Sequence, residues 1–338
     1  MQPVLKLENL SVSFDTLSGE VEAVRDVSLS LDKGEILALV GESGCGKTVM
    51  SQSIMKLLPK TAKVKQGRIL VDGLDITKYN EKQMRPLRSS VLSMVFQDPM
   101  TTLNPTIPIG KQITETILKH NKLSKEQAKA RALAMLDLVG IDNAEQMYLL
   151  QPHFFSGGMR QRCVLAIALA SNPRVLFADE PTTALDVTVQ AKILNLLLDI
   201  RDKTGIAIVF ISHDLGVVAR IADRVAIMYA GRIVEIGTAE EIFYDPRHPY
   251  VWGLMSALPA LARDGKNLSS IPGMPPVMLN PPPGDAFAVR NEFALAIDYE
   301  EMPPMFQISP THSAATWLLD GRAPKVTPPT LLKKRTIL

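Results

Sequence analysis

Short apolar runs alternate with segments whose apolar residues recur at helical spacing along the first 240 residues of the chain. Residues 4–14 and 23–31 alternate between apolar and polar positions on either side of a Ser-Gly turn, which predicts two β-strands. Short apolar runs predict further strands, and apolar residues at helical spacing predict helices. The further strands are expected at 35–40, 67–71, 91–96, 175–178, 207–212 and 224–229, and the helices at 47–58, 156–170, 187–204 and 215–222. This alternation predicts an α/β fold in which helices cover both faces of a mostly parallel sheet.

The segment from about residue 110 to residue 141 interrupts this alternation. Its apolar residues recur at helical spacing, and Ser124 with Gln127 matches the pattern of a capping box. We therefore expect a helical subdomain, at about residues 98–172, within the α/β fold.

The composition of the chain changes after residue 258. Residues 259–338 contain 13 of the 24 prolines, and the hydrophobic periodicity fades there. This shift predicts two domains: an α/β domain at 1–258 and a small, loop-rich C-terminal extension at 259–338.

The strongest candidate for chemistry lies between the apolar run at 35–40 and the helix that follows it. Residues 41–48, GESGCGKT, match the phosphate-binding pattern G-x-x-x-x-G-K-[ST]. Successive N–H groups of such a loop point at phosphate oxygens, and the helix N-terminus adds its positive dipole end. We expect Lys47 to reach the β- and γ-phosphates of a nucleotide and the Thr48 hydroxyl to bind Mg²⁺. The other nucleotide-binding residues expected in this loop are Gly41, Ser43, Gly44, Cys45 and Gly46.

Two carboxylates follow the apolar run at 175–178. Ligands bind at the carboxyl ends of the strands in open α/β sheets, and Asp179 and Glu180 occupy that end of this strand. Asp179 is suited to hold Mg²⁺, partly through water, and Glu180 is placed to polarise an attacking water.

The phosphate-binding pattern is shared by many families of nucleotide hydrolases, and the segment 155–162, FSGGMRQR, indicates one of them. Ser156 and the backbone of Gly157 and Gly158 begin a predicted helix and can donate to a γ-phosphate. The segment resembles the signature of the ABC ATPase family, usually written LSGGQ, with Phe for Leu and Met for Gln. The acidic strand follows some 20 residues later, as the family requires, and the resemblance covers residues 4 to about 240.

The resemblance implies roles for four further residues. Gln97, in MVFQDP, matches the Q-loop, which is implied to sense Mg²⁺ and nucleotide and to contact a membrane subunit. Asp186 matches the D-loop, and His213, in VFISHD, matches the switch histidine that contacts the γ-phosphate. Phe14 stands where the family places an aromatic ring under adenine; its alternative role is that of an ordinary strand residue.

The family's fold and mechanism follow from the same resemblance. It implies an ABC-type P-loop NTPase with a mixed-sheet core, an N-terminal antiparallel β subdomain and a helical subdomain. ATP and Mg²⁺ are the implied cofactors, and the signature of a second ATPase subunit would close each site. The implied catalytic residues are Glu180, His213 and Gln97, and the implied Mg²⁺ ligands are Thr48, Gln97 and Asp179.

Finer resemblance is to the D-type ATPase subunits of bacterial oligopeptide and dipeptide importers, within the peptide/nickel group. It is carried by VFQDPMTTLNP (95–105), QPHFFSGGMRQR (151–162), ADEPTTALDVTVQ (178–190) and DPRHPYVWGLMSALP (245–259). It implies an F-type ATPase partner, two transmembrane permease subunits, an extracytoplasmic substrate-binding protein, and a peripheral position on the cytoplasmic face of the cell membrane. A nickel importer remains an alternative, because the motor does not touch the cargo.

A non-transport ABC ATPase is the alternative from a different class. Translation-factor types usually carry two cassettes, whereas this chain has one, and DNA-repair types insert a long coiled coil that is absent here. The net charge of +2 and the 5% aromatic content also argue against nucleic acid as a partner. Two distant cysteines indicate a reducing compartment, and no apolar run reaches the ~18 residues that span a bilayer.

The extension departs from the family pattern. Many relatives are implied to hold an iron–sulfur cluster there with four cysteines, but the corresponding residues of this chain are Asp285, Asn291, Asp298 and Thr316. Since none is a thiolate, we expect no iron–sulfur cluster. A harder metal bound by Asp285, Asp298 and His312 remains a minor alternative. Packing by large rings is expected to hold the extension together, namely by Phe287, Phe293, Phe306 and Trp317.

Overall fold

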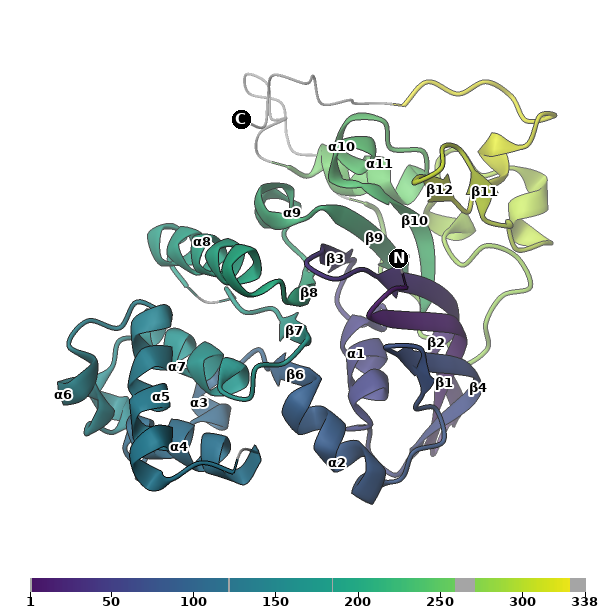
Figure 1. Cartoon of the computed structure of the whole chain (residues 1–338). Coiled ribbons are helices and arrows are strands. Elements are labelled where there is room, and N and C mark those ends of the chain that lie inside the picture. Colours follow the sequence, from purple (N-terminus) through teal and green to yellow (C-terminus); the bar gives the residue numbers. More distant parts are fainter. Residues whose placement is uncertain (1, 121, 184, 259–270, 329–338) are drawn as a thin grey trace. The chain divides into compact units, whose positions relative to one another are not determined.

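The computed structural model describes residues 2–120, 122–183, 185–258 and 271–328. The chain forms two compact units, each assembled from separate stretches of sequence, and Figure 1 labels their elements. The first unit comprises Met1–Leu5, Leu31–Glu35 and Leu70–Ile211, and the second comprises Lys6–Ser30, Ile36–Ile69 and Ser212–Leu338.

Among the described residues, the first unit contains three parallel strands and a group of helices. The strands are β6 (Leu92–Val95), β7 (Val175–Asp179) and β8 (Ala207–Ser212), with β7 between the other two. All residues of β7 and β8 are buried, as expected for parallel strands covered on both faces. The remaining elements of this unit are β5 (Leu74–Asp75), α2 (Glu81–Ser90), α3 (Pro99–Thr102), α4 (Ile109–His120), α5 (Lys125–Leu138), α6 (Ala144–Tyr148), the 3-10 helix η1 (Pro152–Phe154), α7 (Gly157–Leu169) and α8 (Val187–Thr204).

The expected helical segment consists of several helices that pack on one another. Helices α4, α5 and α7 are mutual neighbours (Figure 1). Ser124 caps α5 by accepting from the Gln127 amide, and the Gln127 side chain accepts from the Ser124 amide in return, so the predicted capping box is confirmed. Ala128, Ala132 and Leu136 are fully buried at intervals of four residues, which places one face of α5 in the core.

The second unit contains a mixed sheet in the strand order β11-β12-β10-β9-β3. Strand β3 (Ile36–Val40) is parallel to β9 (Arg224–Tyr229). The next strands are β10 (Arg232–Thr238), β12 (Ser313–Ala314) and β11 (Phe306–Gln307), and the pairs β9–β10, β10–β12 and β12–β11 are antiparallel. A separate sheet places β1 (Leu5–Thr16) between β2 (Gly19–Leu31) and β4 (Ala62–Val71). The helices among the described residues of this unit are α1 (Lys47–Met55), α9 (Leu215–Ile221), α10 (Ala239–Tyr244), α11 (Pro249–Ser256), η3 (Ala288–Arg290), η4 (Ala296–Tyr299) and η5 (Trp317–Leu319).

The predicted fold class is confirmed, with local differences. The helix expected at 47–58 ends at Met55, and the strand expected at 67–71 already begins at Ala62. Strand β10 was not predicted, because the fully buried Glu235 in its centre breaks the apolar pattern that identifies a buried strand. The predicted domain boundary at 258/259 borders residues 259–270, which lie outside the described residues, and it stays a prediction. Within the described residues, no helix is long and apolar enough to cross a membrane.

The C-terminal extension adds strands to the mixed sheet of the second unit. Strand β12 continues the sheet by pairing with β10, where Glu235 is opposite Ala314 and Ile236 is opposite Ser313. His312, just before β12, places its Nε2 2.7 Å from a carboxylate oxygen of Glu235, and both side chains are buried. Glu235 also accepts from the backbone amides of Arg247 and His248. Burial raises the pKa of Glu235, and these donors satisfy its buried oxygens.

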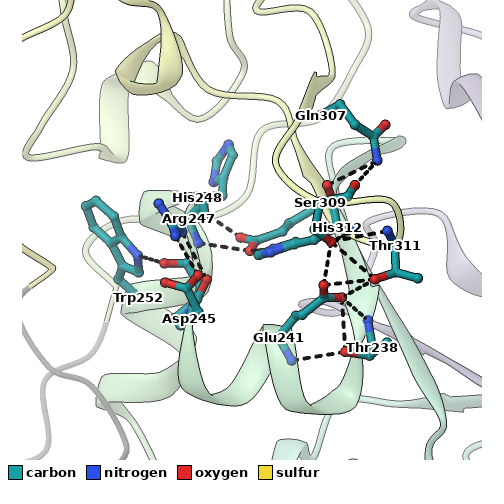
Figure 2. Close-up of polar contacts among 12 residues, drawn as sticks. Thr238, Glu241, Asp245, Arg247, His248, Trp252, Gln307, Ser309, Thr311 and His312 are labelled. Atoms are coloured by element: carbon teal, nitrogen blue, oxygen red, sulfur yellow. Dashed lines mark hydrogen bonds and ion pairs between the residues drawn. The ribbon is translucent and has the colours of Figure 1, made fainter.

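Hydroxyl groups of the extension bind a second carboxylate nearby. Figure 2 shows Ser309 and Thr311 beside Glu241 of α10. The two hydroxyls donate to Glu241 at 2.6 and 2.8 Å, and the backbone amide of Thr238 donates to the same side chain. The extension is therefore bound to the adjacent part of the cassette by polar contacts as well as by the strand pairing.

The four aromatic residues expected to hold the extension together all pack against other rings. Phe306 contacts Trp317 at a centroid distance of 6.0 Å, within the extension. Phe293 contacts Trp252 of α11 at 5.3 Å. Phe287 contacts both Tyr229 and Tyr250 at 5.2 and 5.3 Å. The predicted packing is confirmed, and two of the four rings also bind the extension to the cassette.

The residues at the four cysteine positions each accept a nearby backbone amide. Asp285 accepts from Phe287, Asn291 from Phe293, Asp298 from Leu295 and Thr316 from Leu318. Within the described residues, no group of three His, Cys, Asp or Glu side chains could hold a metal ion. The alternative of a metal held by Asp285, Asp298 and His312 is therefore wrong, because these side chains stabilise turns and the Glu235 contact instead.

The buried carboxyl of Asp285 predicts a pH-dependent effect on stability. Burial raises its pKa from 3.8 to about 6, so the folded state binds the proton more tightly than the unfolded state. The associated stabilisation is present below pH 3.8 and is lost as the pH rises through about 6. Asp285→Asn keeps an acceptor for the Phe287 amide without the charge. We expect its stabilising effect on the free energy of unfolding to be about 1 kcal/mol larger at pH 8 than at pH 5, measured by urea unfolding.

The solvent-exposed Asp142 provides the control for this measurement. Asp142→Asn should change stability equally at the two pH values. An Asp285→Asn effect that is equal at pH 5 and pH 8 would contradict the role given to burial.

Candidate functional site

The predicted nucleotide-site residues are divided between the two units. The second unit contains Phe14, Gly41, Ser43, Gly44, Cys45, Gly46, Lys47, Thr48 and His213. The first unit contains Gln97, Ser156, Gly157, Gly158, Asp179, Glu180 and Asp186.

The phosphate loop connects β3 to α1, as the motif requires. Strand β3 is fully buried and ends at Val40, and α1 begins at Lys47. Gly46 immediately precedes the helix with φ +105°, and a Cβ there would lie 2.2 Å from the carbonyl oxygen of Ala23. A residue with a side chain cannot occupy this position without moving the backbone of β2. The loop therefore has the strand–loop–helix context that places backbone N–H groups at a helix N-terminus.

Lys47 is buried and lies across the loop that precedes it. Its Nζ donates to the carbonyl oxygens of Gly41 and Glu42 at 2.6 and 2.9 Å, and it lies 3.5 Å from the Sγ of Cys45. Burial raises the pKa of the Cys45 thiol, so Cys45 is present as a small neutral group. The lysine ammonium is thus held within the loop that is predicted to bind phosphate.

In the first unit, the register of two parallel strands brings Gln97 and Glu180 together. Strand β6 pairs with β7 so that Val95 is opposite Ala178, and the residues two positions further along are Gln97 and Glu180. The Nε2 of Gln97 donates to the Oε2 of Glu180 at 3.0 Å. These two predicted catalytic residues therefore meet at the carboxyl ends of the strands, where ligands bind in open α/β sheets.

The conformation of Glu180 is fixed by its backbone and by a second donor. Its amide donates to the carbonyl of Ile211, and its φ of +47° is left-handed. This conformation costs a residue with a Cβ about 1–2 kcal/mol. The Thr183 hydroxyl donates to the Oε2 of Glu180 at 3.0 Å, the oxygen that also accepts from Gln97. The backbone turn and the two donors together orient the carboxylate.

The signature residues form the start of α7. Ser156 caps the helix by accepting from the Met159 amide at 3.3 Å, and Gly157 is exposed. A Cβ on Gly158 would lie 2.5 Å from a methyl carbon of Val189 on α8, so glycine permits the close approach of these helices. The Phe155 that replaces the family's Leu is buried and is accommodated as an apolar core residue.

The remaining predicted residues occupy strand ends and caps. Asp186 is the N-cap of α8 and accepts from the Val189 amide at 2.9 Å, while Ala184 of the same D-loop lies outside the described residues. His213 directly follows β8 and its side chain is exposed. Phe14 is a partly exposed residue of β1, and the structure is compatible with either of its two predicted roles.

The residues expected to hold Mg²⁺ fit the chemistry of that ion. Mg²⁺ prefers oxygen ligands, and the expected set consists of a hydroxyl, an amide oxygen and a carboxylate, from Thr48, Gln97 and Asp179. Asp179 is the last residue of β7 and is 5% exposed. The Nε2 of Gln97 faces Glu180, so the amide group is oriented by that contact.

The sequence analysis did not identify three residues that contact the predicted site, namely Thr183, Glu42 and Arg290. Thr183 donates to Glu180, and its position three residues after the glutamate could have indicated a local turn. Glu42 lies inside the phosphate loop at a position that the motif leaves unspecified. Its side chain pairs with Arg290, 248 residues away, and no local signal in the sequence could have indicated that contact.

The strand–loop–helix with Lys47, and the contact of Gln97 with Glu180 at strand ends, are features expected of an ATPase of the ABC class. The comparisons with known proteins agree with this. Residues 24–183 match the ABC transporter family, and residues 234–297 match the oligopeptide/dipeptide transporter C-terminal region.

Curated relatives match along nearly the whole chain. The oligopeptide transport ATP-binding protein OppD of Bacillus subtilis is 56% identical, over 98% of this chain and 93% of the relative. The dipeptide transport ATP-binding protein DppD of Lactococcus lactis is 55% identical, over 97% of this chain and 94% of the relative. The chain therefore belongs to the ATP-binding subunits of the oligopeptide/dipeptide ABC transporter family.

Solved structures match the cassette. A dimeric ATP-binding cassette in a post-hydrolysis state, bound to ADP and Pi, matches with a TM-score of 0.63 and 26% identity, over 70% of this chain and 98% of that one. The cbiO1 component of a Clostridium perfringens ABC transporter complex matches with a TM-score of 0.64 and 29% identity, over 72% of this chain and 91% of that one.

The geometry at Gly46 predicts a large loss of stability on substitution. Gly46→Ala brings a Cβ against the Ala23 carbonyl in a left-handed backbone, and we expect it to lower the free energy of unfolding by about 3 kcal/mol or more. Gly34→Ala is the matched control, because Gly34 also has a positive φ, +73°, but a Cβ there meets no atom within 4 Å. The control should lose only about 1 kcal/mol in urea unfolding. Equal losses would contradict the close approach of β2 to the loop.

Proposed function

We propose that this chain is the ATP-hydrolysing motor of a peptide importer, acting on the cytoplasmic face of a membrane that its permease partners cross. The structural observation that carries the motor assignment is the contact of Gln97 with Glu180 at the ends of β6 and β7. The substrate class is supported by relatives named for oligopeptide and dipeptide transport that match both the cassette and the extension.

The proposed chemistry is hydrolysis of the terminal phosphate of ATP. Lys47 and the loop amides stabilise the charge of the phosphates, and Glu180 orients the attacking water by accepting a hydrogen bond from it. As the water oxygen bonds to the γ-phosphorus, the bond from that phosphorus to the ADP oxygen breaks, ADP leaves with the electron pair, and Glu180 accepts the proton of the water. Gln97 and Thr183 hold the Glu180 carboxylate for this task. His213 is proposed to contact the γ-phosphate, and Phe14 to stack on adenine. Thr48, Gln97 and Asp179 would hold Mg²⁺, which neutralises phosphate charge when bound.

The signature at the start of α7 is proposed to serve a second ATPase subunit. Ser156, Gly157 and Gly158 would donate to the γ-phosphate of ATP held by an F-type partner, and the partner's signature would complete the site of this chain. Asp186 at the N-terminus of α8 would lie at the same subunit contact. Cargo would arrive through an extracytoplasmic binding protein and two permease subunits.

Replacing Glu180 tests the catalytic assignment. Glu180→Gln keeps the size of the side chain and an oxygen that can accept from Gln97, but it removes the charge that orients water. We expect ATP turnover to fall about 10²–10³-fold while ATP binding is retained, measured as phosphate release and as binding of a fluorescent ATP analogue. Lys47→Ala is the contrasting variant and should lose binding itself. Near-wild-type turnover by Glu180→Gln would refute this role.

Peptide uptake by cells tests the substrate class. Cells that lack this chain should regain uptake of labelled oligopeptides when wild type is expressed, and should not regain it with Glu180→Gln expressed to the same level. If assembled wild type restores no peptide uptake, the peptide assignment fails. Labelled nickel would then be offered to the same strains.

A further inference from the structure

Three parts of the second unit meet at Glu42, the second residue of the phosphate loop. Arg290, at the end of η3 in the C-terminal extension, forms a two-pronged ion pair with this side chain. Its Nη1 lies 2.6 Å from Oε2 of Glu42, and its Nη2 lies 3.0 Å from Oε1. The Arg290 side chain is 4% exposed and that of Glu42 is 26% exposed. Such fork-to-fork pairs are stronger and more directional than single contacts, especially where water is largely excluded.

All five N–H groups of the Arg290 guanidinium have an acceptor. Besides the two bonds to Glu42, Nε donates to the carbonyl of Pro272 at 2.7 Å, and Nη2 donates to the carbonyl of Gly273 at 3.3 Å. Nη1 also donates to the hydroxyl of Tyr229 at 3.2 Å. Because every donor is used, the guanidinium has one favoured orientation, and that orientation points its fork at the phosphate loop.

Glu42 is also held through both of its backbone polar groups. Its amide donates to the hydroxyl of Tyr250 on α11 at 2.9 Å, and its carbonyl accepts from the Nζ of Lys47 at 2.9 Å. Tyr250 is fully buried and packs against Phe287 of the extension. The residue that contacts Lys47 is thus fixed at its amide by α11 and at its side chain by the extension.

We propose that Arg290 is a positioning residue for the nucleotide site. By holding Glu42, it keeps the phosphate loop and Lys47 in the arrangement that binds ATP, although Arg290 itself touches no phosphate. The C-terminal extension then belongs functionally to the nucleotide site of this chain. Nucleotide binding and docking of the extension stabilise each other, since any coupling between two such equilibria is reciprocal. This inference rests on the proposed role of residues 41–48 in binding ATP.

The test is ATP hydrolysis by the full chain, assembled with its partner subunits in liposomes, at a series of ATP concentrations. Arg290→Gln removes the ion pair, and we expect the KM for ATP to rise about 10-fold with kcat within about twofold of wild type, because the loop is displaced while Glu180 and Gln97 are untouched. Arg290→Lys keeps the charge but not the fork, and its KM should lie between the two. Arg322→Gln is the matched control, since Arg322 pairs with Asp320 in the same extension without contacting the loop, and it should leave KM unchanged.

Glu42→Gln tests the same ion pair by changing its partly exposed partner. This variant replaces Arg290→Gln in the test if Arg290→Gln does not fold. A purely electrostatic role of Glu42 would repel ATP, so its removal would lower the KM. A positioning role predicts that the KM rises. The double variant Glu42→Gln/Arg290→Gln should be no worse than Arg290→Gln alone, because both changes break one interaction.

The outcomes separate this inference from the proposed function. Wild-type KM values in folded Arg290→Gln and Glu42→Gln, with only a lower unfolding temperature, would show that Arg290 merely anchors the extension and would overturn the proposal. A lowered KM in Glu42→Gln would overturn it as well. If Lys47→Ala retains full ATP binding, the role of the loop itself fails, and the proposed function is refuted independently of Arg290.

Discussion

Buried parallel strands can present polar groups only where they end, and this constraint determines where chemistry can occur in each unit. Strands β3, β7 and β8 are buried throughout, so the polar residues needed to bind a phosphate follow their last apolar residues. In the second unit, the phosphate loop begins directly after β3. In the first unit, the pairing register of β6 and β7 fixes which residues meet, and it brings Gln97 to Glu180.

The C-terminal extension has little regular secondary structure, so other interactions must stabilise its fold. It contributes two-residue strands to a sheet edge and depends on satisfied polar contacts to fix its position. The buried Glu235 is the clearest case, because it accepts from two backbone amides and lies within hydrogen-bond distance of His312. An unpaired carboxylate at that depth would be strongly destabilising. The residues that occupy the four cysteine positions also accept backbone amides, so each has a local structural role that requires no metal.

The contact of Arg290 with Glu42 joins the C-terminal extension to the phosphate loop at the end of β3. The buried guanidinium of Arg290, in the extension, is directed at the phosphate loop. The guanidinium donates to two backbone carbonyls of the extension, to the hydroxyl of a tyrosine of β9, and to the carboxylate of Glu42 in the loop. A change in the docking of the extension would therefore be transmitted to Lys47 through a single residue.

By itself, the sequence determined the fold class, the order of most strands and helices, and the motifs of the site, because these depend on local spacing. The motifs are a glycine-rich loop between an apolar run and a helix, two carboxylates after a buried strand, and a serine before a helix. It also determined that no thiolate occupies the cluster positions. Only the tertiary structure decided that β10 is a strand despite its central glutamate, that Gln97 is opposite Glu180, and that Arg290 binds Glu42. The contacts of Gln97 and Arg290 join residues 83 and 248 positions apart in the chain, so they depend on strand register and burial and leave no periodic signal in the sequence. Strand β10 pairs with the preceding strand β9, but the contact of its buried glutamate with His312 joins residues 77 positions apart.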